Sequence, residues 1–329
     1  MTFPFNVYFA AFFGAIVASA VSFPLWKRWC ERVGHVDDPG HRKIHTAPIP
    51  LAGGLTVMTG FFVPIFLGAI GLAFMHSQSP FESPLQYGLT TRAVQLIVIC
   101  LGAFGMVILG WLDDRYELRP LLKFSGQVLI ALLVAWSGIR VTLFIPSEIA
   151  AYLFTVLWIL TITNAVNFLD NMNGLCTGLG FIAGWTCAWA AAIQGQYLVA
   201  TLAFLICGAL AGFFPFNFPK AHAFLGDAGS HLVGFLAAVL AILPNFYSSQ
   251  TPHPLAVLSP LFILGVPLYD LVTVVLLRWR KGQPFYVGDT NHISHRLTRR
   301  GYSRSHAVLI LLLIHAILSA IAILGLSRI

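Results

Sequence analysis

Long runs of apolar residues are the feature of this sequence that most constrains its fold. Ten runs occur, most of them roughly 18–25 residues long, which is the length of helix that crosses a bilayer. They lie at 5–26, 51–75, 93–112, 121–138, 150–168, 175–193, 197–216, 228–246, 255–277 and 306–326. The pattern predicts an all-α, polytopic membrane helix bundle of about ten transmembrane helices, formed by a single domain over residues 1–329. Only 9% of the residues are charged, which excludes an ordinary soluble domain, where roughly 25% are charged.

Lysine and arginine are distributed unevenly between the two sides of this predicted bundle. The loops after the first, third, fifth, seventh and ninth runs hold 16 of the 19 basic residues, counting Lys123 at the start of the fourth run. Only Arg92, Arg140 and Arg328 fall on the other side. Because cytoplasmic loops carry the excess of basic residues, we expect the basic side to be cytoplasmic and both termini to lie outside. We expect the protein in the cell inner (cytoplasmic) membrane as a multi-pass protein.

Acidic residues are also one-sided, although topology does not require it. Of the twelve, only Glu82 and Glu148 fall on the outer side. Acidic residues contribute little to membrane orientation, so their concentration on the cytoplasmic side indicates a functional site there. Five segments that are far apart in the sequence carry the polar residues of that side.

The first segment is a basic loop. Arg42, Lys43 and His45 are followed by two prolines and by the pair Gly53 and Gly54. Such a loop could hold phosphate groups, because proline and glycine stop helices and glycine lets the backbone approach a ligand. The alternative is an ordinary positively charged cytoplasmic loop with a turn.

The second segment, GWLDDRYELRPLLKF, places two acids beside each other at the membrane boundary. Asp113 and Asp114 are adjacent, and Lys123 follows nine residues after Asp114. Neighbouring carboxylates raise each other's proton affinity unless a cation neutralises them. A lysine at this depth needs an anion or must reach the interface. A divalent metal or a positioned basic side chain could supply the charge, and a solvated acidic turn is the alternative.

The third segment, TNAVNFLDNMNGL, concentrates amides at the end of the fifth run. Asn164, Asn167 and Asp170 are three residues apart and share one side of a helix, and Asn171 and Asn173 follow. Burying so many polar groups is costly without partners. Their oxygens are hard ligands of the kind that magnesium prefers. The alternative is helix capping combined with interhelical hydrogen bonds.

The fourth and fifth segments add an acid and a polar loop. Asp227 opens the eighth run between two glycines, either as a helix cap or as part of a site. The last cytoplasmic loop contains His292, His295 and Arg296 without the spacing of a zinc site. Phosphate contact, proton transfer and a basic amphipathic helix on anionic lipid all remain open for this loop. Asp270 lies within the ninth run, and intramembrane carboxylates are commonly functional.

At these five segments the sequence resembles the polyprenyl-phosphate N-acetylhexosamine-1-phosphate transferase superfamily, which includes the MraY translocase of peptidoglycan synthesis. The motifs occur in family order and cover nearly the whole chain. They read DPGHRKIHTAPIPLAGG, GWLDDRYELRPLLKF, NAVNFLDNMNGL, FLGDAGSHLVGF and PLYDLVTVVLLRWRKGQPFYVGDTNHISHRL. The resemblance implies that a polyprenyl phosphate attacks the β-phosphorus of a UDP-N-acetylhexosamine. The products are a polyprenyl-diphosphate sugar and UMP, with magnesium, or alternatively manganese, as the cofactor.

The resemblance also implies roles for individual residues. Asp113 and Asp114 would activate the lipid phosphate or organise the metal site, and Asp227 and Asn167 would be magnesium ligands. Lys123 would hold the diphosphate.

The remaining positions would contact the donor. Asp170 and Asn173 would shape the nucleotide site, and His292 would act among the catalytic residues. His295 and Arg296 would contact phosphates or sugar.

The chain departs from the family pattern at three positions. Asn171 stands where the family has glycine, Asn173 where it has an acid, and Ser294 where bacterial relatives often have a histidine. The run of three consecutive histidines typical of the MraY branch is absent. These features favour an N-acetylglucosamine-type donor, with the muramyl-pentapeptide donor as the alternative. The expected partners are a UDP-N-acetylhexosamine and polyprenyl phosphate, with no nucleic acid, and a homodimer is left open.

Two other classes fit parts of the sequence. A multi-span transporter or lipid flippase would explain the ten runs and Asp270, but the polar groups gather at one face and not at mid-membrane. A binding protein for anionic lipid would explain the basic last loop, but it leaves the paired acids and the amide cluster without a role.

Overall fold

The computed structural model describes residues 2–39, 47–78, 84–141, 146–244, 246, 254–284 and 290–326, and it is mostly helical. The α-helices are α1 (Phe5–Val33), α2 (Gly53–Gln78), α3 (Pro84–Thr91), α4 (Ala93–Tyr116), α5 (Pro120–Trp136), α6 (Glu148–Phe168), α7 (Leu175–Ile193), α8 (Tyr197–Asn217), α9 (Gly226–Leu240), α10 (Ser259–Ile263), α11 (Gly265–Arg280), α12 (Ile293–Arg299) and α13 (Arg304–Leu326). The other elements are the strands β1 (Val36–Asp37) and β2 (Ile49–Pro50) and the 3-10 helix η1 (Pro254–Leu258). The predicted helical fold is confirmed, with one small strand pair in addition.

Seven of the described helices are long and apolar enough to cross a membrane, namely α1, α2, α4, α6, α7, α8 and α13. The span predicted over 255–277 is broken instead of continuous, because η1 and α10 meet α11 at an angle of 68°. Pro267, in the first turn of α11, explains the break. Proline has no N–H to donate to the preceding turn, and its ring clashes with that turn. Counted as one span, this bent pair brings the total among the described helices to eight.

Helix α9 lies at the centre of the bundle. All of its residues except Asp227 are buried, and α2, α4, α6 and α7 pack against it. A Cβ atom on Gly110 of α4 would overlap the backbone carbonyl of Asp227, and one on Gly54 of α2 would overlap the backbone of Gly229. Small residues at helix contacts let membrane helices approach closely. This packing fixes the start of α9 beside the start of α2 and the last turns of α4.

Backbone hydrogen bonds join the strand pair to the segment that leads into α9. The strands β1 and β2 are antiparallel. The N–H of Phe224 donates to the carbonyl of Pro50 at 3.0 Å, and the N–H groups of Gly53 and Gly54 donate to the carbonyls of Phe224 and Leu225, each at 2.9 Å. The loops that precede α2 and α9 therefore form one backbone unit beside Asp227.

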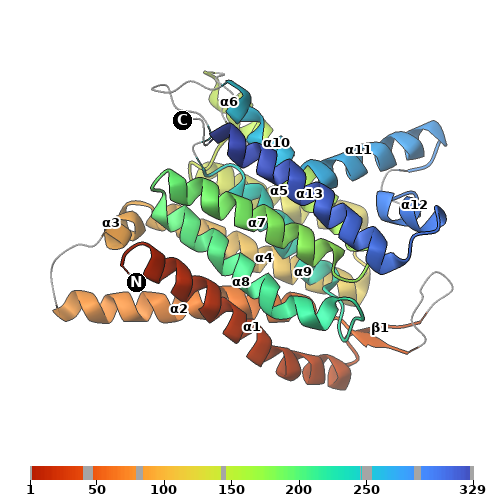
Figure 1. Cartoon of the computed structure of the whole chain (residues 1–329), viewed down its shortest axis with the longest axis horizontal. Helices are drawn as coiled ribbons and strands as arrows, with labels where there is room; N and C mark the ends of the chain where they lie inside the picture. The colour runs from red at the N-terminus through yellow and green to blue at the C-terminus, as the bar shows by residue number, and fades with distance from the viewer. Residues whose placement is uncertain are drawn as a thin grey trace.

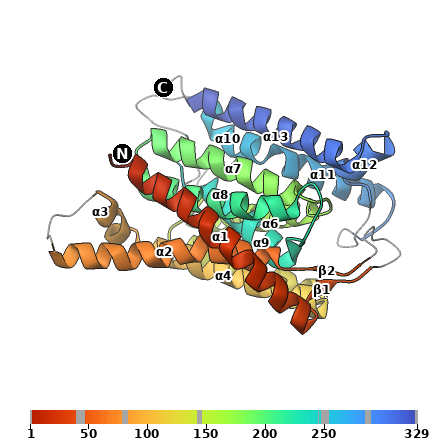
Figure 2. The ribbon, with the colours of Figure 1, turned by 60° about the horizontal axis from the view of Figure 1, so that its bottom comes forward.

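The strand pair marks one end of the bundle. This end also holds the last turns of α11 and the short helix α12, whereas α1 begins and α13 finishes at the opposite end (Figures 1 and 2). The end with β1, β2 and α12 carries the polar segments described next.

Candidate active site

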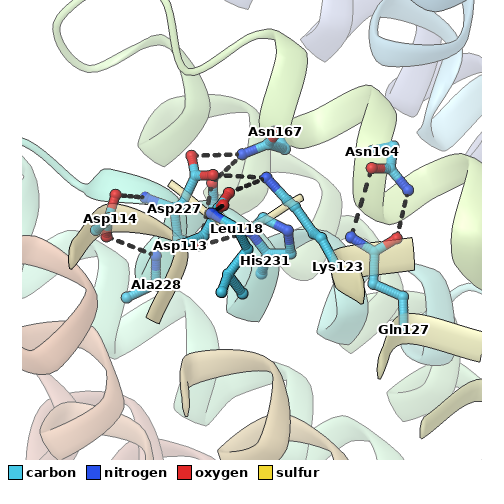
Figure 3. Close-up of polar contacts among 11 residues, drawn as sticks. Asp113, Asp114, Leu118, Lys123, Gln127, Asn164, Asn167, Asp227, Ala228 and His231 are labelled. Carbon is cyan, nitrogen blue, oxygen red and sulfur yellow. Dashed lines mark hydrogen bonds and ion pairs between the residues drawn. The ribbon is translucent and has the colours of Figure 1, made fainter. Parts of the chain in front are cut away.

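Lys123 joins two carboxylates that come from different helices. Its Nζ lies 2.5 Å from Oδ2 of Asp113 and 2.6 Å from Oδ2 of Asp227 (Figure 3). Lys123 lies in the first turn of α5, Asp113 near the end of α4 and Asp227 in the first turn of α9. The side chain of Lys123 is only 18% exposed, so its charge is stabilised by these two acids and not by bulk water. The structure thus brings Lys123 together with two of the acids that the sequence singled out, Asp113 and Asp227.

Asp114 holds the start of α9. Its Oδ1 accepts a hydrogen bond of 2.9 Å from the N–H of Asp227, and its Oδ2 accepts one of 3.1 Å from the N–H of Ala228. The first N–H groups of a helix have no partner within the helix, and a carboxylate there also interacts favourably with the helix dipole. Asp114 therefore caps α9 from the side of α4 and fixes the position of Asp227.

Asp113 has different partners from its neighbour. Its Oδ1 accepts a hydrogen bond of 2.9 Å from the N–H of Leu118, while its Oδ2 faces Lys123. The adjacent acids are thus divided between two tasks, because Asp113 contacts the lysine and Asp114 contacts the backbone of α9. The sequence predicted the pair but did not distinguish the two.

Asn167 extends the cluster from α6. Its Nδ2 donates to Oδ1 of Asp227 and to Oγ of Ser230, both at 2.9 Å. One turn earlier on α6, Nδ2 of Asn164 donates to Oε1 of Gln127 at 2.7 Å, and Nε2 of Gln127 faces Oδ1 of Asn164 at 3.4 Å (Figure 3). This amide pair ties α6 to α5, and so sets Asn167 in register with Lys123.

Asp170 stands at the turn after α6, near the same charges. Burial raises the pKa of Asp170 well above its usual range, and the negative charges of Asp227 and Asp114 raise it further. A carboxyl group in this situation favours a proton or a cation beside it. The structure therefore places Asp170 within the electrostatic reach of the cluster.

A cavity of about 660 Å³ opens beside the acids. Among the described residues that line it, six are acidic and one, Arg115, is an arginine. Its lining consists of Gly34, His35, Val36, Asp37, Asp38, Leu51, Asp113, Asp114, Arg115, Glu117, Leu118 and Asp227. A phosphate ligand would be repelled from such a wall unless a cation neutralised it.

The segment that leads into α12 contacts α11 and α6, and none of its described hydrogen bonds joins it to Lys123. Nδ1 of His292 lies 2.6 Å from Oδ2 of Asp270, and the ring of His292 meets that of Phe168, the last residue of α6, edge to face at 5.9 Å. His295 and Arg296 are half-buried on α12, and burial lowers the pKa of His295, with the nearby charges of His292 and two arginines acting in the same direction.

Among the described residues, Asn173 has its contact elsewhere. Nδ2 of Asn173 donates to the carbonyl of Pro219 at 3.2 Å, so Asn173 is tied to the segment between α8 and α9. Arg42, Lys43 and His45 lie outside the described residues.

Several neighbours of the cluster are not among the site residues predicted from the sequence. Ser230 and His231 contact Asn167 and the backbone of Asp227, respectively. Gln127 and Ser230 could have been found by helix spacing, because residues three or four apart lie on one face, and they follow Lys123 by four and Asp227 by three. His35 is 2% exposed and lines the cavity, and no sequence pattern distinguishes it.

A magnesium ion in this site would meet carboxylate and amide groups, those of Asp113, Asp227 and Asn167. Among the described residues, no group of three or more His, Cys, Asp or Glu side chains is arranged to hold a metal ion. However, Asp113 and Asp227 already share one cation, the ammonium group of Lys123. Magnesium is usually bound through one or two carboxylates, substrate phosphates and water. The residues therefore fit a magnesium ion that is shared with a diphosphate, and not one enclosed by protein ligands alone.

Known proteins resemble this chain along most of its length. Residues 96–245 match the model of glycosyl transferase family 4. A probable undecaprenyl-phosphate N-acetylglucosaminyl 1-phosphate transferase of Bacillus subtilis is 33% identical over 321 residues, which cover 95% of this chain and 83% of the relative. A decaprenyl-phosphate N-acetylglucosaminephosphotransferase of Mycobacterium tuberculosis is 32% identical, over 86% of this chain and 73% of the relative.

An Escherichia coli protein is more distant but similar in extent. It is an undecaprenyl-phosphate alpha-N-acetylglucosaminyl 1-phosphate transferase, 27% identical over 91% of this chain and 78% of its own length. The match to the family model covers α4 to α9, which carry Asp113, Asp114, Lys123, Asn167 and Asp227. The chain therefore belongs to glycosyl transferase family 4, within the superfamily of polyprenyl-phosphate N-acetylhexosamine-1-phosphate transferases.

Proposed function

We propose that this protein transfers N-acetylglucosamine 1-phosphate from UDP-N-acetylglucosamine to a polyprenyl phosphate in the membrane, and so performs the first membrane step of a cell-envelope polysaccharide. The names of the relatives support the transferred group and the lipid acceptor. The observation that carries the proposal is the meeting of Lys123 with Asp113 and Asp227 beside an acidic cavity. A transporter would be expected to hold such groups near mid-membrane, along its substrate path.

The reaction exchanges one phosphoanhydride bond for another. An oxygen of the polyprenyl phosphate forms a bond to the β-phosphorus of the UDP-sugar, and the bond from that phosphorus to the bridging oxygen breaks. The electron pair of the broken bond leaves with UMP, so that the lipid carries a diphosphate and the sugar. Phosphoryl transfer of this kind depends mostly on holding the reactants in line and on neutralising their charge.

Different residues of the site would bind the metal, position its ligand and neutralise the diphosphate. Asp227 and Asn167 would hold magnesium, and Asp114 keeps Asp227 in place through the backbone of α9. When bound, the ion would neutralise the diphosphate and stabilise the leaving phosphate. Lys123 places a further positive charge between Asp113 and Asp227, where the diphosphate would meet the acidic wall of the cavity. Asp113 lies close enough to Lys123 to orient it toward the lipid phosphate.

The membrane arrangement that we propose has ten spans, both termini outside and the site at the cytoplasmic face of the inner membrane. The bent pair, α5 and α9 correspond to the three predicted spans that are shorter or broken. Helix α9 is only about 22 Å long at a rise of about 1.5 Å per residue, against about 30 Å of hydrocarbon. Surrounding helices enclose it, so its short length does not expose its ends to lipid.

The test is an assay with purified protein in nanodiscs. UMP should be released only when UDP-N-acetylglucosamine and undecaprenyl phosphate are both present. The Asp227→Asn variant should release none, whereas Glu148→Gln should match the wild type, because Glu148 is 85% exposed at the start of α6. Binding of either substrate without UMP release would contradict the proposal and favour a transporter or a lipid-binding protein.

A donor panel tests the sugar. UDP-N-acetylglucosamine should give more product than UDP-N-acetylgalactosamine or UDP-N-acetylmuramoyl-pentapeptide. Product from the pentapeptide donor alone would place the protein in the MraY branch.

A further inference from the structure

A second acid, away from the lysine cluster, makes a paired contact with a predicted catalytic residue. Asp270 of α11 is completely buried. Its Oδ2 lies 2.6 Å from Nδ1 of His292, and its Oδ1 accepts a hydrogen bond of 2.7 Å from the N–H of Ile293. Both oxygens of this carboxylate are therefore used at the point where α12 begins.

We propose that Asp270 is a positioning residue that fixes the ring of His292 for the transfer reaction, an inference that rests on the proposed function. An ionised carboxylate can only accept hydrogen bonds, so Nδ1 of His292 carries a proton toward Asp270. Nε2 is then the ring nitrogen left for substrate. A histidine held in this way by a carboxylate keeps one tautomer and one orientation.

The surroundings of His292 are fixed by contacts that do not involve Asp270. The ring lies edge to face against Phe168, and the guanidinium of Arg278 lies 5.1 Å from the centre of the same Phe168 ring. Two residues after His292, in the first turn of α12, Oγ of Ser294 donates to Oδ1 of Asn171 at 2.6 Å. These contacts tie the start of α12 to the end of α6, the helix that carries Asn167.

Asp270 could act mainly through either of its two partners, the N–H of Ile293 or Nδ1 of His292. If Asp270 only docks α12, the N–H of Ile293 is the important donor, and any acceptor at position 270 suffices. If Asp270 sets the tautomer, the important partner is Nδ1 of His292, and an acceptor-only group is required. The Asp270→Asn variant distinguishes them, because an amide oxygen still accepts from Ile293 while the amide nitrogen donates to the ring and favours the opposite tautomer.

Kinetics give the first readout. In a catalytic triad, replacement of the orienting aspartate by asparagine leaves the geometry intact and lowers kcat about 10⁴-fold. We expect Asp270→Asn to lower kcat by about 10²- to 10⁴-fold on this precedent, with KM for both substrates within about threefold. The control is Thr273→Val on the same helix, which should keep wild-type kcat. Within the part of the chain that the structure describes, its hydroxyl bonds the carbonyls of Tyr269 and Asp270 alone.

A double-variant cycle tests whether Asp270 acts through His292. In a His292→Gln background, Asp270→Asn should lower kcat by less than about threefold further, because coupled residues are not additive. A full additional loss would show that Asp270 acts independently and would overturn the proposal. The Asp270→Glu variant, which retains an acceptor-only group, should recover at least part of the kcat lost in Asp270→Asn.

A spectroscopic measurement on the unaltered chain does not depend on any variant at position 270. In protein labelled with ¹⁵N-histidine, and with the signal assigned by its loss in His292→Gln, Nδ1 of His292 should carry a proton. A His292 ring protonated at Nε2 alone would overturn the proposal even if Asp270→Asn failed to fold. This signal is independent of turnover, so an inactive wild-type protein would remove the proposed function and leave the tautomer measurement readable.

Discussion

Oγ of Ser294 donates a hydrogen bond of 2.6 Å to Oδ1 of Asn171, across 123 residues of sequence. These are two of the three positions at which the chain departs from the family pattern. Ser294 is completely buried, and Asn171 also donates from Nδ2 to the carbonyl of Phe168 at 2.8 Å. The two departures are therefore a matched donor and acceptor that connect α12 to the turn after α6.

The free-energy costs of removing the two partners should not add. Ser294→Ala should destabilise the fold by about 0.5–1.5 kcal/mol, because the half-buried Asn171 loses its donor. Asn171→Gly combined with Ser294→Ala should cost clearly less than the sum of the two single changes. Denaturant unfolding in detergent measures this, and strictly additive losses would show that the contact contributes nothing.

Loss of the charge on Lys123 should strongly lower kcat. Lys123→Met leaves Asp113 and Asp227 facing each other without a cation, and we expect kcat to fall by about 10²- to 10⁴-fold, which corresponds to about 3–5 kcal/mol. Lys123→Arg should recover part of that loss, because the charge returns in a different shape. UMP release measures both.

The matched control is a lysine in an exposed ion pair. Lys27 lies 3.9 Å from Glu31 on α1, with its side chain 35% exposed, and such pairs contribute little. Lys27→Met should therefore keep wild-type activity. Equal losses in the two lysine variants would remove the special role of Lys123.

The adjacent acids should respond differently to neutralisation. Asp114→Asn places an NH2 group against the N–H of Ala228 and removes the charge that caps α9, so its melting temperature should fall by several degrees more than that of Asp113→Asn. Both variants should lose about 10²-fold or more in kcat. Parallel thermal unfolding and kinetic measurements check this, and an unchanged melting temperature for Asp114→Asn would contradict the capping role.

Removal of divalent ions should stop the reaction reversibly. A chelator should abolish UMP release, and added Mg²⁺ should restore it. Asn167→Ala should raise the magnesium concentration for half-maximal rate by about 10- to 100-fold, because it removes a predicted ligand that also holds Asp227. Near-normal turnover of Asp227→Asn in the same titration would take Asp227 out of the metal site.

The sequence predicts the helices and the site better than it predicts the details of either. Apolar length identifies the spans, and repeated polar residues at one membrane face identify Asp113, Lys123, Asn167 and Asp227, because burying such groups is costly unless they meet. The sequence predicts a continuous span over 255–277 and not the break at Leu264, because the apolar run continues through Pro267, which causes the break.

The different tasks of the two adjacent acids depend on tertiary contacts. Asp114 caps a helix that begins 112 residues later in the sequence, and no local pattern shows which of two neighbouring carboxylates will face that backbone. Likewise, no local pattern shows that Ser294 and Asn171, which are 123 residues apart, form a hydrogen bond.

The central claim is that the sugar moves together with a phosphate group. The product that receives the β-phosphorus of the donor tests this claim most directly. UDP-N-acetylglucosamine labelled with ³²P at the β-phosphorus is incubated with the protein, magnesium and undecaprenyl phosphate. Sugar-phosphate transfer moves the label into the lipid product and leaves UMP unlabelled. Label that stays with the nucleotide as UDP would mean that only the sugar moves, and it would contradict the account.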